Sequence, residues 1–182
     1  MTGGRGGVIL CKKEYADAID KAVFPGTQGT TAVSNIAGKA TIAKLAKEDN
    51  FINVQRKTLD SAKLLAAELA EKGYRLVGGG TDTHQVLVDV TTKGLSGSQA
   101  EKILESIGIV TNRNYIPKDT GKIASGLRLG TGPISVRGID KDYVIQIANI
   151  IDNALMARDN QEVLSKLKRN VLGICKQFPV YR

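Results

Sequence analysis

Residues 124–138, which read ASGLRLGTGPISVRG, organise the predicted fold of this chain. They place Arg128 on a short predicted strand between Gly126 and Gly130. Glycines on both sides of an arginine let another backbone or a ligand come close to it. A planar guanidinium on a rigid strand suits two-point capture of a carboxylate. The alternative is an arginine on an edge strand that pairs with a surface acid.

Outward from this stretch, apolar spacing predicts alternating helices and strands. The predicted helices span residues 51–72, 99–107, 141–157 and 160–177, and the predicted strands span 74–77, 84–90, 109–112 and 127–129. Ser96 and Gln99 have the spacing of a capping box. Short loops between these elements predict an α+β fold, with a small mixed or antiparallel sheet and helices on one face.

The first fifty residues fit this unit poorly. The apolar run at 8–11 predicts a strand that is buried on both faces. Helices are predicted at 13–23 and 33–47, with a turn at 24–31 between them. Thr30 or Thr31 can cap the second helix. The alternative is that Gly29 and these threonines form an anion site from free N–H groups and hydroxyls.

Composition narrows the function. The 182 residues carry a net charge of +8, which favours anionic partners. Only 4% of residues are aromatic and tryptophan is absent, which argues against a stacking surface for nucleic acid. The chain has no long apolar run and no apolar signal core near its start, so we expect a cytoplasmic protein without a membrane span. Cys11 and Cys175 lie in apolar surroundings, which predicts reduced, buried thiols.

His84 is the only histidine of the chain and has no partners at the spacing of metal ligands, so no metal site is expected. Its position at the start of a predicted strand is typical of a hydrogen-bonded structural histidine. The alternative is a catalytic base, which needs a partner and a pocket.

Six motifs, in the same order along the chain, are similar to those of serine hydroxymethyltransferases. They are RGGVILC from Arg5, AVFPGxQG, GGTDxHxVLVD, NxNxIPxD, SGLRLGT and the C-terminal VLxICxxFPVY. The resemblance implies a pyridoxal-phosphate enzyme of fold type I that acts as a dimer or tetramer. Such an enzyme transfers a one-carbon unit between serine and tetrahydrofolate. The resemblance also implies two parts: residues 1–50, a remnant of the large cofactor domain, and residues 51–182, the small domain.

The resemblance assigns roles to single residues. Arg128 matches the arginine that holds the substrate carboxylate. Gly29 and Thr30 match the glycine pair whose backbone approaches the cofactor phosphate of the neighbouring subunit. Asn114 matches an asparagine that contacts the pteridine of folate. Arg137, like His84, matches a family residue near the site, and both are interpreted as structural.

The sequence also departs from the family pattern. The Schiff-base lysine of the family follows a run of threonines and a histidine, a few residues before the RGG motif, and no lysine of this chain matches it. The family residues that hold the pyridine ring belong to that same N-terminal part. Thr30 replaces the second phosphate glycine, and the folate loop is shortened to residues 121–124. We therefore expect no catalytic residue in this chain, no pyridoxal phosphate bound by it alone, and no activity of the isolated chain.

Three functions remain open from the sequence. The chain can be half of a split enzyme, in which a separate chain supplies the cofactor domain and its lysine. The partner expected from the resemblance is that separate chain or a second copy in a homo-oligomer. It can be a non-catalytic binding or regulatory module. It can also be a truncated gene product whose C-terminal part folds by itself.

Overall fold

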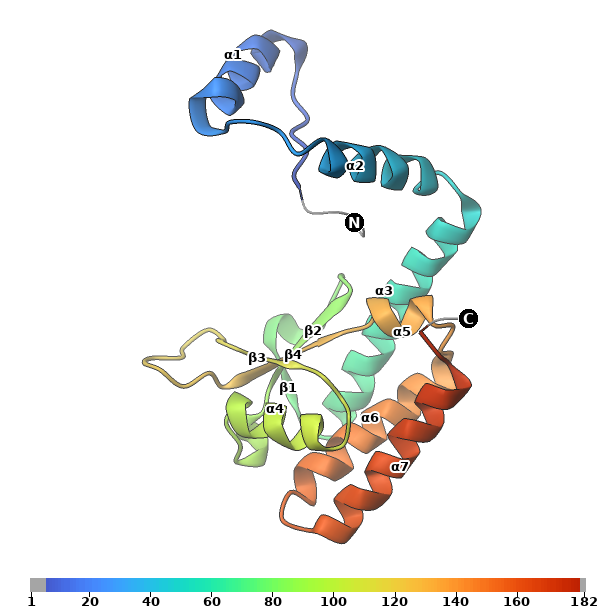
Figure 1. The fold of residues 1–182 in the computed structure, drawn as a ribbon. Coiled ribbons are helices and arrows are strands. Elements are labelled where there is room, and N and C mark those ends of the chain that lie inside the picture. The colour runs from blue at the N-terminus through green and yellow to red at the C-terminus, as the bar shows by residue number, and fades with distance from the viewer. Residues whose placement is uncertain (1–5, 181–182) are drawn as a thin grey trace. The chain divides into compact units, whose positions relative to one another are not determined.

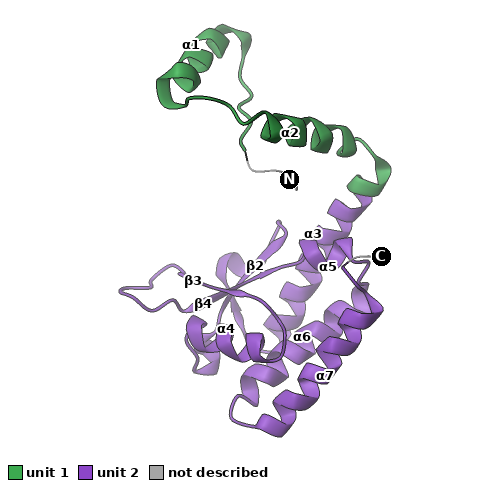
Figure 2. Ribbon diagram, viewed as in Figure 1, with its two compact units in different colours: residues 1–52 green, residues 53–182 purple. Residues whose placement is uncertain are grey.

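The computed structural model describes residues 6–180, so Arg5 of the RGG motif lies outside the described residues. The chain divides into two compact units, Met1–Ile52 and Asn53–Arg182 (Figure 2). The second unit holds the sheet and the hydrophobic core. In the described part of the chain, no helix is long and apolar enough to cross a membrane.

The sheet has four antiparallel strands in the order β1-β2-β4-β3. These strands are β1 (Arg75–Leu76), β2 (Gln85–Asp89), β3 (Asn112–Asn114) and β4 (Gly126–Gly130). The helices are α3 (Asp49–Glu71), α4 (Gly97–Ser106), α5 (Gly132–Val136), α6 (Lys141–Met156) and α7 (Gln161–Gln177) (Figure 1). This arrangement confirms the predicted α+β fold.

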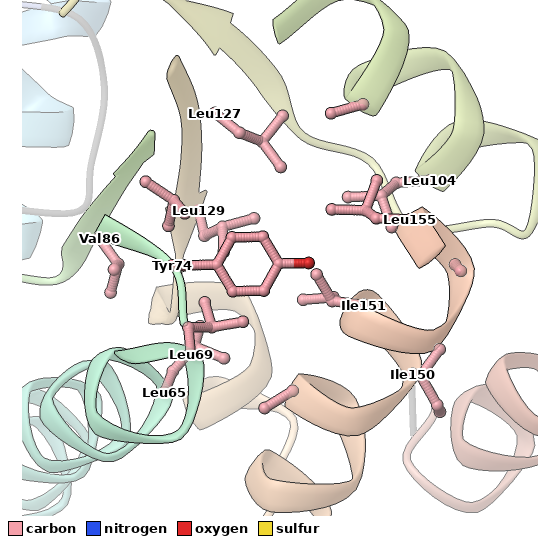
Figure 3. Close-up of a cluster of buried hydrophobic side chains, with 14 of the residues drawn as sticks. Leu65, Leu69, Tyr74, Val86, Leu104, Leu127, Leu129, Ile150, Ile151 and Leu155 are labelled. Carbon is pink, nitrogen blue, oxygen red and sulfur yellow. The ribbon is translucent and has the colours of Figure 1, made fainter. Parts of the chain in front are cut away.

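One face of the sheet packs on the helices. Alternate residues of the two central strands, Val86 and Val88 on β2 and Leu127 and Leu129 on β4, are buried. They share one core with Leu65 and Leu69 of α3, Leu104 of α4, and Ile151 and Leu155 of α6 (Figure 3). Because side chains alternate along a strand, the residues between these positions point away from the core. Arg128 is one of them, and its side chain is exposed.

Tyr74, just before β1, lies inside this core (Figure 3). The Lys93 ammonium lies 4.7 Å from the centre of its ring. The same ammonium donates a hydrogen bond to the Lys72 carbonyl near the end of α3. Burial, together with the nearby Asp152 carboxylate, raises the pKa of the Tyr74 hydroxyl. The tyrosine therefore stays neutral at physiological pH and serves the packing of the core.

Side-chain caps fix the starts of three helices. Ser96 accepts a hydrogen bond from the Gln99 N–H, and the Gln99 side chain accepts one from the Ser96 N–H, which confirms the capping box. Asp140 accepts from the Tyr143 N–H at the start of α6, and Asn160 caps α7 in the same way. These caps satisfy N–H groups that have no partner within the helix.

Unit 1 is built differently. After a 3-10 turn at Lys13–Tyr15 it contains α1 (Ala16–Lys21), an irregular turn at Ala22–Thr27 and α2 (Val33–Leu45). None of its described residues, from 6 to 52, is buried. The first residues of α3, from Asp49, also belong to this unit. Unit 1 therefore lacks a core of its own.

Several predictions for unit 1 are wrong. Residues 8–11 do not form a buried strand, and Val8, Ile9 and Leu10 are 65%, 64% and 90% exposed. A strand needs a neighbour for its backbone N–H and C=O groups, and no described segment pairs with this one. Cys11 is exposed rather than buried, while Cys175 is half-buried.

Two further predictions need correction. The residue at the N-cap of α2 is Ala32, and no side chain caps this helix, so neither threonine does so. The third strand is Asn112–Asn114 rather than 109–112, because its register is set by pairing with β4. Val110, in the apolar run that indicated a strand, is 87% exposed. The structure also contains the short helix α5, which the apolar spacing of the sequence does not predict.

Candidate functional site

Arg128 lies at the middle of β4, an interior strand of the sheet. It faces Leu87 of β2 on one side and Asn112 of β3 on the other. Its neighbours Leu127 and Leu129 are buried in the core. The backbone of β4 at Arg128 is therefore fixed by pairing with β2, by pairing with β3 and by the packing of these two leucines. The alternative of an arginine on an edge strand is therefore wrong. Its guanidinium is exposed on the face of the sheet opposite the core.

The two glycines beside Arg128 differ in what they allow. A Cβ built on Gly126 would lie 2.7 Å from the Asn114 carbonyl oxygen and would also overlap the Ile116 side chain. A glycine is therefore required there for the close approach of β3 to β4. A Cβ on Gly130 would meet no atom within 4 Å. The chain itself fills the space at Gly126 and leaves the space at Gly130 open.

The partner of Arg128 is a neutral amide. Its Nη2 donates a hydrogen bond of 3.2 Å to the side-chain oxygen of Asn112. The other two arginines of the sheet each have a carboxylate: Arg75 lies 2.6 Å from Asp89, and Arg113 lies 2.8 Å from Glu101. Within residues 6–180, no carboxylate forms an ion pair with Arg128. Among the described residues, Arg128 therefore differs from Arg75 and Arg113 in having no carboxylate within ion-pair distance, although Asp82 lines the same cavity.

Arg128 lines a small, open cavity of about 290 Å³ on this face of the sheet. The other lining residues are Val77, Gly80, Thr81, Asp82, Thr83, Gln85, Leu87 and Asn114. They come from β2, from β3 and from the glycine-rich loop that precedes β2. The cavity is thus polar, with one guanidinium, one carboxylate and two side-chain amides.

Threonine hydroxyls hold the loop beside this cavity. The Thr81 hydroxyl donates to the Gln85 carbonyl at 2.6 Å and accepts from the Thr83 N–H at 3.1 Å. The Thr83 hydroxyl accepts from the Gln85 N–H at 3.2 Å. Between them, Asp82 is exposed. Hydroxyls that bond to nearby backbone groups are a common way to fix a turn.

The Asp119 carboxylate fixes the loop that joins β3 to β4. Asp119 accepts hydrogen bonds from the Ile116 N–H at 2.9 Å and from the Ser125 N–H at 3.0 Å. The bonds from Ser125 and Ile116 hold the pKa of Asp119 below its ordinary value. The carboxylate therefore stays ionised. By bonding to both ends of the loop between β3 and β4, it holds together the segments in which Asn114 pairs with Gly126.

Asn114 belongs to the same cavity as Arg128. It is half-buried on β3, and its side-chain N–H donates to the Tyr115 carbonyl at 2.8 Å. That bond fixes the orientation of the side-chain amide, whose oxygen is a hydrogen-bond acceptor. The structure thus brings together two of the predicted site residues, Asn114 and Arg128.

His84 and Arg137 are not in the lining of this cavity. The carbonyl of His84 accepts hydrogen bonds from the N–H and the hydroxyl of Thr131, at 3.0 and 3.2 Å, and its side chain is exposed. The Nε of Arg137 donates to the Phe178 carbonyl at 2.7 Å. This bond ties the end of α5 to the end of α7.

Gly29 and Thr30 lie in unit 1, in the exposed loop before α2. A Cβ on Gly29 would meet no atom within 4 Å. Because α2 has no side-chain cap, the N–H groups of Val33 and Ser34 in its first turn are available to an anion, whereas that of Asn35 donates to the Ala32 carbonyl at 2.9 Å. The loop thus offers the Thr30 hydroxyl and two N–H donors to a group of the charge of a phosphate. No described residues of the chain form a cluster of histidine, cysteine and acidic side chains that suits a metal.

Sequence reasoning missed Asn112, Asp82 and Gln85. The sequence pattern places Asn112 at the end of a strand, and its position opposite Arg128 follows only from the β3–β4 register. The alternation of β2 predicts that Gln85 faces away from the core, which was a usable signal. Nothing in the local sequence connects Asp82 with an arginine 46 residues later.

Residues 1–151 match the family described as serine hydroxymethyltransferase. The match covers most of the chain, including the loop at Gly29, the cavity loop at Thr81 and the strand of Arg128.

Proposed function

Since the chain belongs to the serine hydroxymethyltransferase family, we propose that it supplies the substrate-carboxylate site of such an enzyme. The observation that carries the proposal is Arg128: a guanidinium on a rigid strand, beside a polar cavity, with a neutral amide as its partner. A guanidinium fork matches a carboxylate with two parallel hydrogen bonds. Serine and glycine, the amino acids that the family uses, both present a carboxylate.

We propose that the cavity also sets the orientation of the second substrate. Asn114 lines the same cavity as Arg128, which supports a contact between its amide and the pteridine ring of tetrahydrofolate. A pteridine carries both donors and acceptors on one edge, and an asparagine amide offers one of each. The two residues would then hold the amino acid and the folate near each other, which favours transfer between them.

The loop before α2 is proposed to hold the phosphate of pyridoxal phosphate. Gly29 leaves room for close approach of an anion, Thr30 adds a hydroxyl, and the uncapped first turn of α2 adds N–H donors. When bound, pyridoxal phosphate supplies an electron sink for bond cleavage at the amino acid. The role of these residues is limited to binding and orienting the phosphate.

The lysine that holds the cofactor is proposed to come from outside these 182 residues. No lysine of the chain matches the family motif, so the isolated chain is expected to be inactive. The exposed apolar side chains of unit 1, among them Leu10 and Phe24, support association with a further segment. That segment belongs to the same polypeptide or to a partner chain, as in a split enzyme.

Native co-purification tests the proposed function. The tagged chain is isolated from lysate of its own cells, and the eluate is assayed for pyridoxal phosphate and for serine–glycine exchange. We expect the eluate to contain a lysine-bearing partner, pyridoxal phosphate and exchange activity. The cofactor and the activity should both be lost when the partner is removed. An Arg128→Ala variant should retain the partner and lose the exchange. A wild-type complex that contains the cofactor and shows no exchange would leave a regulatory module as the function.

A further inference from the structure

Asn112 is the hydrogen-bond partner of Arg128 and does not itself line the cavity. The two residues are direct cross-strand partners, Asn112 on β3 and Arg128 on β4. Both side chains point to the face of the sheet opposite the hydrophobic core, and both are exposed. The side-chain oxygen of Asn112 accepts from Nη2 of the guanidinium at 3.2 Å.

The chemical type of this partner is unusual within the sheet. The guanidinium of Arg75 lies against the buried carboxylate of Asp89, and that of Arg113 lies against Glu101. In each of these pairs the carboxylate neutralises the arginine and takes donors of its fork. An amide oxygen can orient a guanidinium in a similar way, and it leaves the positive charge in place.

The geometry leaves part of the fork available. A guanidinium has five N–H donors, and the bond to Asn112 uses one of them, on Nη2. An exposed arginine without a partner samples many rotamers, and ordering it costs conformational entropy when a ligand binds. A single bond from the neighbouring strand reduces that cost, since the guanidinium is already held beside the cavity.

We propose that Asn112 is a positioning residue for Arg128: it holds the guanidinium beside the cavity and, because it is neutral, leaves the charge to the substrate carboxylate. The inference rests on the proposed function of Arg128 and adds to it a residue that acts through the arginine. Aspartate at position 112 would have nearly the same shape and would accept the same hydrogen bond. It would also place a competing carboxylate on the guanidinium.

Side-chain NMR of the chain itself tests this role. The ¹H–¹⁵N signal of the Arg128 Nε group is assigned with an Arg128→Lys variant and followed while acetate is added at constant ionic strength. Acetate serves as the simplest carboxylate probe. The variants are Asn112→Asp, Asn112→Leu and, as a control for net charge, Asn160→Asp. Asn160 caps α7, and aspartate caps a helix equally well.

We expect wild-type Arg128 to bind acetate in a saturable way. Asn112→Asp should weaken the binding by about tenfold, since its carboxylate competes directly for the guanidinium. Asn112→Leu should weaken it by roughly threefold through loss of orientation. Asn160→Asp should leave it unchanged. Thermal unfolding of Asn112→Asp should occur at or above the wild-type temperature. If Asn112 had a merely structural role, a loss of binding would instead be accompanied by a lower unfolding temperature.

Two outcomes separate the proposals. If the wild type binds acetate and both Asn112 variants bind it equally well, the role of Asn112 is overturned and that of Arg128 stands. If wild-type Arg128 does not respond to acetate, the proposed carboxylate site fails, and the inference on Asn112 fails with it.

Discussion

At the scale of single residues, the molecule distinguishes arginines by their partners. Arg75 and Arg113 each hold a carboxylate and join elements of the fold. Arg128 has an amide partner and lines a cavity instead. The same side chain therefore has a structural role at two positions of the sheet and a proposed binding role at the third. The difference lies in the neighbouring element: β2 and α4 each supply an acid, whereas β3 supplies an amide.

The fork of Arg128, rather than its charge alone, should determine binding. Arg128→Lys keeps the charge but presents a single ammonium in place of a planar fork. We expect acetate binding, measured by the same NMR titration on backbone signals of β4, to weaken by about tenfold. Arg158→Lys, at an exposed position outside the sheet, is the matched control and should bind like the wild type. Equal binding by both variants would contradict the role of the fork.

Asp89 should make stability depend on acid. Burial raises the pKa of this carboxyl, and the hydrogen bonds from Thr91 and the Arg75 guanidinium outweigh that effect, so the pKa lies below its ordinary value. The folded state thus holds the proton less tightly than the unfolded state, whose pKa is about 3.9. The stabilisation is complete well above pH 4 and is lost as the pH falls through the folded-state pKa.

Urea unfolding at several pH values measures this contribution. Asp89→Asn should lower the free energy of unfolding by about 2 kcal/mol near pH 7, because it removes the charged hydrogen bonds to Arg75. The difference between variant and wild type should shrink as the pH is lowered from 6 to 3. A difference that stays constant over this range would show that the charge of Asp89 does not stabilise the fold.

At the scale of elements, β4 is the strand on which the cavity depends. It is interior to the sheet. On one face it carries Arg128, which lines the cavity, and on the other it carries Leu127 and Leu129, which are buried in the core. Gly126 at its start permits the close contact with β3 that sets Asn112 opposite Arg128. The register of these two strands is therefore the element-level condition for the site.

The two glycines of β4 should respond differently to alanine. Gly126→Ala would push its methyl group against the Asn114 carbonyl and Ile116, and we expect a loss of about 2 kcal/mol in the free energy of unfolding. Gly130→Ala has open space and should change stability by less than about 0.5 kcal/mol. Urea unfolding of both variants checks this. Similar values for the two would mean that β3 moves away from β4 at little cost.

At the scale of the whole molecule, the two units differ in how they are stabilised. Unit 2 buries a continuous core between its sheet and its helices. Unit 1 has no buried residue among those described, although it contains Val8, Ile9, Leu10 and Phe24. Because burial of apolar surface is the main driving force of folding, unit 2 holds nearly all of the stability of this chain.

A fragment of residues 48–182, which keeps the whole of α3, should therefore fold by itself. We expect its thermal unfolding midpoint to lie within about 4 °C of that of the full chain, a shift that corresponds to roughly 1 kcal/mol. Limited proteolysis of the full chain should cut within residues 6–48 before it cuts unit 2. A fragment that fails to unfold cooperatively would show that unit 1 stabilises the fold.

The sequence by itself determined the alternation of helices and strands from residue 51 onward, the helix cap at Ser96, the strand of Arg128 and the family. These features depend on neighbours within a few residues, where apolar spacing and capping residues act directly. Only the tertiary structure decided the strand order β1-β2-β4-β3, the register that sets Asn112 opposite Arg128, and the exposure of residues 8–11. Strand pairing joins segments that are distant in sequence, and an apolar run becomes a buried strand only where a neighbour pairs with it. For that reason the sequence alone singles out Arg128 as a candidate, whereas its partner Asn112 and the cavity beside it required the fold.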